Sequence, residues 1–173
     1  MKKLILLLFL STNLVVSAQN YTINLAVDTV FPDKKAVAEL WFNYLKSTPD
    51  SLYNNPFWNE KEKQNYKGFD FLNSEGYLFP SLHYFRNNNK ILSISNFQDG
   101  YLIRSIFYQQ DFTVFVIANV VARKENGKFV LANYLPYHTK DWQHIKTEFI
   151  NYVAHPNHIF DESKVKDANN YLT

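Results

Sequence analysis

Residues 90–134 read KILSISNFQDGYLIRSIFYQQDFTVFVIANVVARKENGKFVLANY, and this stretch decides the fold. β-branched and aromatic residues dominate it, and the run from Ile91 to Ser95 alternates as a strand with one buried face does. Three short polar spacers divide the stretch into four runs: Asp99-Gly100, Gln109 to Asp111, and Glu125 to Lys128. Each spacer is short enough for a hairpin, so the stretch predicts four successive antiparallel strands.

The strongest turn signal in this stretch is Asn126-Gly127. A type I′ turn needs positive φ at both central residues, and Asn followed by Gly meets that need at low cost. We therefore expect the runs Phe112 to Ala122 and Lys128 to Tyr134 to pair antiparallel.

A helix is predicted before the strands, from Pro32 to Ser47. Pro32 suits a first helical turn, and Pro49 prevents continuation soon after Ser47. Apolar residues recur there with the spacing of one helix face, at Val37, Leu40, Trp41, Tyr44 and Leu45. Residues 50–80 carry Pro and Gly among many polar residues, which predicts short helices joined by turns. A second helix is expected to begin within residues 57–62.

The C-terminal part of the chain has an ambiguous pattern. Residues 142–153 carry apolar side chains at helical spacing, but residues 149–153 would also make a short strand, which we prefer. A terminal helix is predicted from Asp161 to Leu172, with Asp161 or Ser163 as its cap.

These expectations together predict an α+β fold. The N-terminal helix packs on a curved antiparallel sheet, in the manner of a cystatin-like or NTF2-like cone, and a C-terminal helix follows.

The first 18 residues have the three-part order of a secretory signal peptide. Lys2 and Lys3 precede an apolar run that reaches to Leu10, and Ala18 ends a small-residue cleavage site. The apolar run is too short to span a bilayer. We expect cleavage after Ala18 and export to the periplasm or the medium, so that residues 19–173 form a single domain without a membrane span.

The composition of the mature chain limits the classes of function it can have. Removal of 18 residues from 173 leaves 155. The leader contains two lysines and no acidic residue, so the mature chain has 16 basic and 16 acidic residues. Such a balance of charge does not favour a nucleic-acid-binding surface.

The chain has no Cys, which excludes disulfides and a lipidated cysteine. The 15 Phe, 12 Tyr and 3 Trp predict an aromatic-rich core, and an exposed aromatic platform for sugar or peptide is the alternative.

The order of strand, loop and helix from Phe149 to Leu172 resembles the start of gluzincin-type zinc peptidase domains in secreted Bacteroidetes proteins. The resemblance implies an accessory module that precedes a peptidase region. The chain has no His-Glu-x-x-His motif, in which two His hold zinc and the Glu activates water. We therefore expect this chain to be a stand-alone relative of the accessory module or a shortened product of a longer ancestor, and not the catalytic part.

One local spacing is typical of a metal site. His155 and His158 lie three residues apart, and Asp161 follows three residues later, so a loop could bring two imidazoles and a carboxylate onto one zinc ion. Pro156 disfavours a helical arrangement of the pair, and solvated histidines in a surface loop are the alternative interpretation. No other cofactor is expected.

No catalytic residues stand out from the sequence. It has no Cys nucleophile, serine elbow or glycine-rich phosphate loop. Ionisable groups at Asp70, His83, Asp99 or Arg104 could line a cone interior, but nothing in their spacing selects them. The leading hypothesis is an exported noncatalytic binding or interaction module for a peptide, a glycan or a partner protein. The alternatives are a small enzyme or fragment associated with a zinc peptidase-like protein, and a structural module that forms a homodimer through its sheet.

Overall fold

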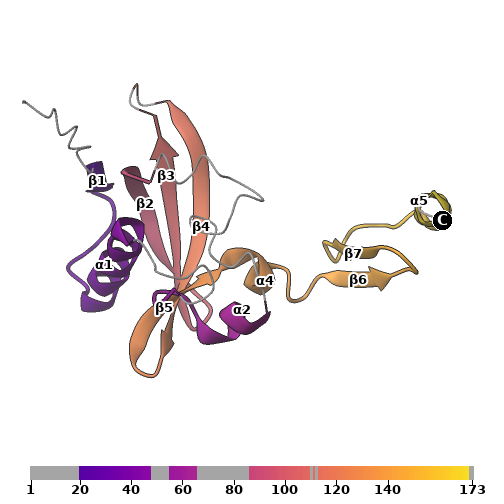
Figure 1. The fold of residues 1–173 in the computed structure, drawn as a ribbon, viewed down its shortest axis with the longest axis horizontal. Helices are drawn as coiled ribbons and strands as arrows, with labels where there is room; N and C mark the ends of the chain where they lie inside the picture. Colours follow the sequence, from indigo (N-terminus) through magenta and orange to yellow (C-terminus); the bar gives the residue numbers. More distant parts are fainter. Residues whose placement is uncertain (1–19, 48–54, 66–85, 110, 112, 172–173) are drawn as a thin grey trace, which may run out of the picture.

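The computed structural model describes residues 20–47, 55–65, 86–109, 111 and 113–171. A short strand and a helix come first, and four later strands join the first strand in a five-stranded sheet (Figure 1). A two-stranded sheet and a last helix end the chain. The α+β class, with a helix packed on a largely antiparallel sheet, is confirmed.

The five-stranded sheet has the order β1-β2-β3-β4-β5. All four hairpin strands predicted from residues 90–134 are present and antiparallel, as β2 (Asn88–Phe97), β3 (Gly100–Tyr108), β4 (Val114–Glu125) and β5 (Lys128–Asn133). The edge strand β1 (Asn20–Ile23) runs parallel to β2, and this pairing was not predicted.

Two tight turns connect these strands. Asn126 and Gly127 both have positive φ, 51° and 79°, which confirms the predicted turn between β4 and β5. The turn between β2 and β3 places Gln98 at a φ of 52° and brings Gly100 against the backbone of Ala122 in β4. A side chain at residue 100 would collide with that backbone, so glycine is needed there for close approach.

The predicted first helix is α1 (Pro32–Lys46), with Ser47 as its C-cap. It packs against the sheet (Figure 1) and buries one face there. The largest fully buried side chains of this core are Trp41, Tyr44, Leu45, Trp58, Ile91, Ile103, Phe107 and Leu131. Because rings supply a large buried area per residue, these side chains account for much of the core that a chain without disulfides needs.

The second predicted helix is α2 (Glu60–Asn65). The residues before it lie along the outer edge of β5, where the amide of Asn59 donates to the carbonyl of Leu131 at 2.8 Å. The amide of Leu131 donates in turn to the carbonyl of Phe57 at 2.7 Å. The short helices and turns expected elsewhere within residues 50–80 lie largely outside the described residues.

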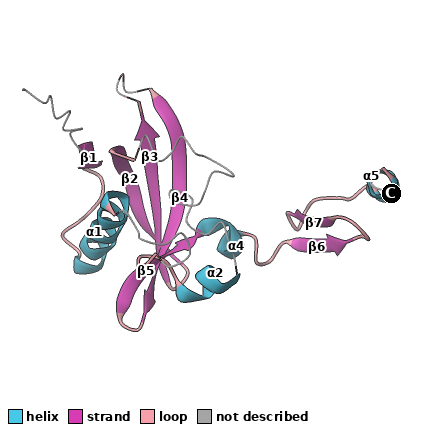
Figure 2. Cartoon of the chain, viewed as in Figure 1, coloured by secondary structure: helices cyan, strands magenta, loops and turns pink. Residues whose placement is uncertain are grey.

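After β5 come α4 (Tyr134–His138), β6 (Gln143–Lys146), β7 (Asn151–Ala154) and α5 (Glu162–Asn170). Strands β6 and β7 form a separate antiparallel pair, which lies with α5 away from the five-stranded sheet (Figure 2). The strand preferred for residues 149–153 is confirmed from Asn151 onward, and the helical alternative is wrong. The predicted cap of α5 is also present, because Oδ1 of Asp161 accepts hydrogen bonds from the amides of Ser163 and Lys164.

The longest described helix, α1, has 15 residues. None of the described helices is long and apolar enough to cross a bilayer.

Candidate functional site

Large side chains fill the space between α1 and the sheet. Trp41, Tyr44 and Trp58 each expose 1% or less of their surface. Three polar side chains of this interior bond to one another: Trp41 Nε1 donates to Oδ1 of Asn89, whose Nδ2 donates to Ser105 Oγ. A ligand site therefore has to be sought outside this packed interior.

A groove of about 810 Å³ opens at one end of the sheet. It lies between α2, the β2–β3 turn, the end of β4 and the residues around α4, and we call it the α2–α4 groove. Its charged lining residues are Lys61, Arg123, Lys124, Lys140, Glu62 and Glu125. Its other lining residues are Asn59, Gln98, Pro136 and Tyr137.

Arg123, near the end of β4, is held by two neighbouring elements. Its guanidinium lies over the ring of Tyr137 from α4, with 4.8 Å between the guanidinium carbon and the ring centroid. Its Nη2 also forms an ion pair with Asp99 of the β2–β3 turn. This hydrogen bond holds the pKa of the Asp99 carboxyl below its usual range. Gln98 fastens the same turn to α4, because its Nε2 donates to the carbonyl of Tyr137 at 3.2 Å. The guanidinium is thus fixed in orientation before any ligand arrives.

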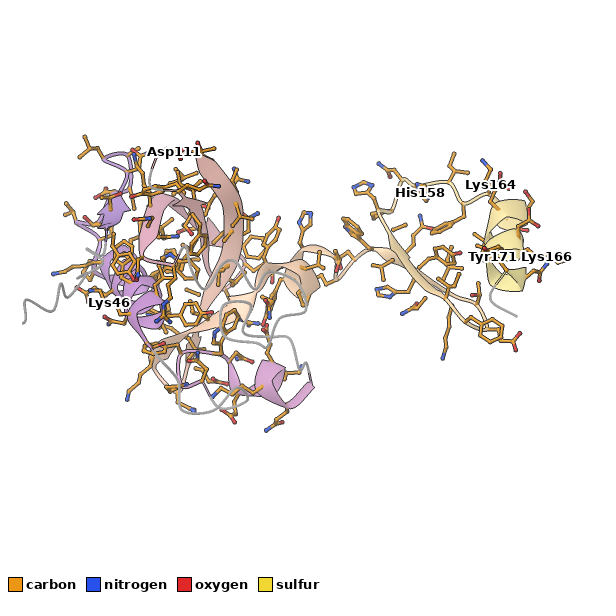
Figure 3. All side chains as sticks on the ribbon, turned by 45° about the horizontal axis from the view of Figure 1, so that its top comes forward. Lys46, Asp111, His158, Lys164, Lys166 and Tyr171 are labelled. Atoms are coloured by element: carbon orange, nitrogen blue, oxygen red, sulfur yellow. The ribbon has the colours of Figure 1, made fainter. Side chains whose placement is uncertain are left out.

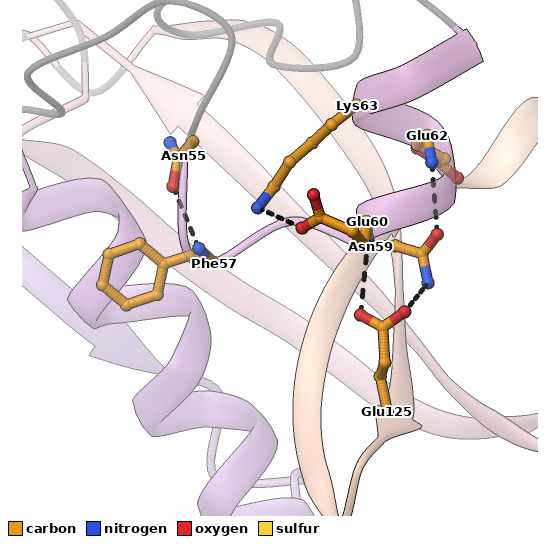
Figure 4. A network of polar contacts seen from close by, with 7 residues as sticks. All are labelled: Asn55, Phe57, Asn59, Glu60, Glu62, Lys63 and Glu125. Atoms are coloured by element: carbon orange, nitrogen blue, oxygen red, sulfur yellow. Dashed lines mark hydrogen bonds and ion pairs between the residues drawn. The ribbon is translucent and has the colours of Figure 1, made fainter.

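Both acidic lining residues are tied to the protein. The Glu62 carboxylate accepts hydrogen bonds from the backbone amide of Asn133, at 2.9 and 3.0 Å, and from Asn133 Nδ2 at 2.8 Å. Burial raises the pKa of Glu62 above its ordinary value, although the hydrogen bonds from Asn133 act in the opposite direction. Glu125 accepts from Asn59 Nδ2 and from the amide of Glu60 (Figure 4).

The charged run from Glu60 to Lys63 is less exposed than its residue types indicate. A mixed-charge run of this kind is typical of a solvated helix face, but Glu62 is only partly exposed and bonds to Asn133. The Lys63 side chain exposes 8% of its surface, and its Nζ lies 2.9 Å from Glu60 Oε2. A short helix that lies against β5 has less solvated surface than its charge pattern indicates.

The residues predicted to bind zinc are not gathered into one site. His155 Nδ1 accepts a hydrogen bond from the amide of Asn157, and the ring of His158 lies edge-on to Phe160. Asp161 caps α5 and lies 3.7 Å from Lys164 Nζ. Among the residues that the structure describes, no three His, Asp or Glu side chains are placed to hold a metal ion. The zinc site stays a prediction, and metal analysis of the purified mature chain tests it.

Of the other ionisable residues named from the sequence, the structure describes Asp99 and Arg104. Asp99 reaches Arg123 beside the groove, and Arg104, further along β3 on the sheet face away from α1, donates to Asn119 Oδ1 at 3.2 Å. Asp70 and His83 lie outside the described residues. Sequence reasoning missed Arg123 and Tyr137, although the charged run from Arg123 to Glu125 that ends the apolar strand β4 was a usable signal.

The C-terminal part has a second hollow, of about 370 Å³, between β6 and α5. Its lining includes Ile145, Phe160 and Val165, and Ile159 nearby is 90% exposed. This part of the chain lies far from α1, as the labelled residues Lys164, Lys166 and Tyr171 of α5 and its end show (Figure 3). This smaller, largely apolar hollow has fewer fixed polar groups than the α2–α4 groove.

Comparisons with protein families, with curated proteins and with solved structures find no match to this chain. The fold and site together define an α+β protein with a packed interior and a polar groove at one end of its sheet.

Proposed function

We propose that the mature chain is an exported, noncatalytic binding module whose ligand occupies the α2–α4 groove. The observation that carries this proposal is the position of Arg123, whose guanidinium lies over the ring of Tyr137 where the groove opens. Binding sites hold few polar groups in set positions, because ordering them on association would cost affinity. Export is supported by the residue order of the first 18 positions.

A filled interior favours binding over catalysis. An enzyme with a cone fold would be expected to enclose a pocket in which ionisable groups converge, but Trp41, Tyr44 and Trp58 occupy that space here. The same proposal fits the accessory role that the C-terminal resemblance implies. A cystatin-like or NTF2-like form of the α+β fold is likewise part of the proposal.

One observation favours a small enzyme as the second candidate. Glu62 lines the groove, and its pKa is raised by burial, which is a property of general acids. Its oxygens, however, accept three hydrogen bonds from Asn133, so the carboxylate already serves to join α2 to β5. Release of reducing ends or amines from the ligands tested below would support this candidate instead.

Oligomerisation through the sheet is less well supported. The sheet face opposite α1 exposes Ile117, but polar Ser95 and Arg104 are exposed on the same face. A stable homodimer face needs a more continuous apolar patch.

Titration of the ¹⁵N-labelled mature chain with acidic and neutral oligosaccharides and peptides tests the proposed function. We expect amide shifts to gather around the groove, at Gln98, Arg123 and Tyr137. Tyr137→Ala should weaken binding about tenfold, by loss of ring contact and of support for Arg123. Tyr171→Ala, the same change at an exposed ring near the C-terminus, serves as the control. Shifts confined to the C-terminal part, or no shifts with any probe, would overturn the proposal.

A further inference from the structure

We infer that the α2–α4 groove recognises the carboxylate of an acidic oligosaccharide through Arg123, and that Asp99 occupies the place of this carboxylate in the free protein. The inference rests on the proposed function and adds the chemical class of the ligand. Its starting point is the arrangement of Arg123, Tyr137 and Asp99.

The guanidinium of Arg123 is prepared for a carboxylate. A guanidinium carries its donors in one plane, and that plane fits the two oxygens of a carboxylate. The guanidinium lies over the ring of Tyr137, and Asp99 meets it at Nη2.

Asp99 is a replaceable partner. Its side chain is 63% exposed, whereas that of Arg123 is 30% exposed. Exposed ion pairs add little to stability, so the fold does not depend on this contact. A ligand carboxylate that takes the place of Asp99 keeps the charge of Arg123 balanced and returns Asp99 to water.

The rest of the lining favours an anion. Lys61, Lys124 and Lys140 add positive charge, and Lys124 also pairs with Asp33 at 3.1 Å. The two lining acids already accept hydrogen bonds within the protein, Glu125 from the amide of Glu60 and Glu62 from Asn133 of β5. The four basic residues of the lining outnumber these two acids, and this excess of positive charge favours an anion.

The edge of β5 argues for a saccharide over a peptide. Extended peptides bind by adding a strand to a free sheet edge. Beside the groove that edge is already occupied, because Leu131 pairs with the backbone at Phe57 and Asn59, and the amide of Asn133 bonds to Glu62. A ligand here has to be recognised by side chains, and the amides, ring and guanidinium of the groove suit the hydroxyls and carboxylates of sugar acids.

Isothermal titration calorimetry with trigalacturonate as the probe tests the inference. We expect the wild-type mature chain to bind it, and added salt to weaken the binding. Asp99→Asn should tighten binding about three- to tenfold by removing the internal competitor. Arg123→Lys, which keeps the charge and loses the planar fork, should weaken it at least tenfold. Asp111→Asn, the same change as at Asp99 but at an exposed aspartate away from the groove, should leave the affinity unchanged. Circular dichroism confirms that each variant is folded.

The other outcomes separate the two proposals. Equal binding of maltotriose at the groove, or unchanged affinity in both Asp99→Asn and Arg123→Lys, overturns the carboxylate inference and leaves the binding module standing. Binding of tri-glutamate in place of trigalacturonate, with the same dependence on Arg123, overturns the saccharide assignment in favour of an acidic peptide. If none of the three probes binds, the inference is overturned. The amide-shift titration with the wider set of ligands then tests separately whether the groove binds a ligand at all.

Discussion

The indole nitrogen of Trp41 in α1 donates a 2.9 Å hydrogen bond to Oδ1 of Asn89 in β2, and both residues are fully buried. Asn89 Nδ2 continues the network to Ser105 Oγ in β3, at 3.3 Å. Three elements thus meet at one amide in an otherwise apolar core. Buried polar groups cost little only when they are bonded, so this network fixes how α1 sits on the sheet.

Asn89→Ala should lower the free energy of unfolding by about 2–4 kcal/mol, because it removes the partner of Trp41 Nε1 and leaves a cavity. Urea denaturation followed by fluorescence measures the change. Ser95→Ala, at an exposed position of the same strand, should change stability by less than about 0.5 kcal/mol. A loss at Asn89 no larger than at Ser95 would contradict this account.

Glu62→Ala should cost about 1–3 kcal/mol, because the amide and side chain of Asn133 lose their acceptor. Glu39→Ala, at an exposed position of α1, is the matched control and should cost little. Urea denaturation of both variants checks the difference.

The change of the free energy of unfolding with pH should also show the raised pKa of Glu62. Its pKa is raised in the folded protein, so the folded state binds a proton more readily than the unfolded state does. Its contribution to stability is therefore greatest below the unfolded value of about 4.3 and is lost as the pH rises through the folded value. In the difference between wild type and Glu62→Gln, we expect this fall to begin near the unfolded value of about pH 4.3 and to continue above it. A flat difference from about pH 3 to about pH 7 would show that the pKa of Glu62 is not raised.

Gly100→Ala should destabilise the fold more than Gly127→Ala. A Cβ at residue 100 would run into the carbonyl oxygen of Ala122, so β3 and β4 would have to separate, at a cost of about 1–3 kcal/mol. A Cβ at residue 127 meets nothing within 4 Å, and only its φ of 79° is unfavourable, at about 1–2 kcal/mol. Denaturation midpoints of the two variants provide the test, and the reverse order would contradict the close approach at Gly100.

Protein recovered from a producing bacterium should begin at Gln19 in intact-mass and N-terminal peptide analysis. Ala18→Asp should block processing because the cleavage site needs a small residue. Ala26→Asp, beyond the leader, should leave it unchanged. An intact leader on wild-type protein in the cytosol would rule out export by this signal.

Local chemistry predicted α1 and the strands β2 to β5, because helical spacing, alternation and the Asn126-Gly127 turn act over a few residues. The parallel pairing of β1 could not be predicted, since it depends on partners nearly 70 positions away, such as Asn20 and Asn88. Strand β6 was missed for a nearer reason. Thr147 closes the turn before β7, where its Oγ1 accepts from the amide of Ile150 at 3.0 Å, and that signal was not used.

The groove was harder to predict than the sheet. Glu62 and Asn133 are 71 positions apart, and Arg123 and Asp99 are 24 apart. A single sequence does not predict contacts between residues so far apart when these residues are polar and belong to no periodic pattern. The pattern of His155, His158 and Asp161 was more conspicuous, yet turn bonds and helix capping account for the contacts of His155 and Asp161.

The covered edge of β5 affects the tendency of the protein to aggregate at high concentration. An open strand edge is a template on which another chain can add, and repetition of that step builds fibrils. Residues 57–59 and the Glu62 carboxylate occupy the outward backbone groups of Leu131 and the amide of Asn133, through which β5 could otherwise pair with a neighbour. A chain so rich in rings and β-branched residues thus keeps one end of its sheet from seeding aggregation.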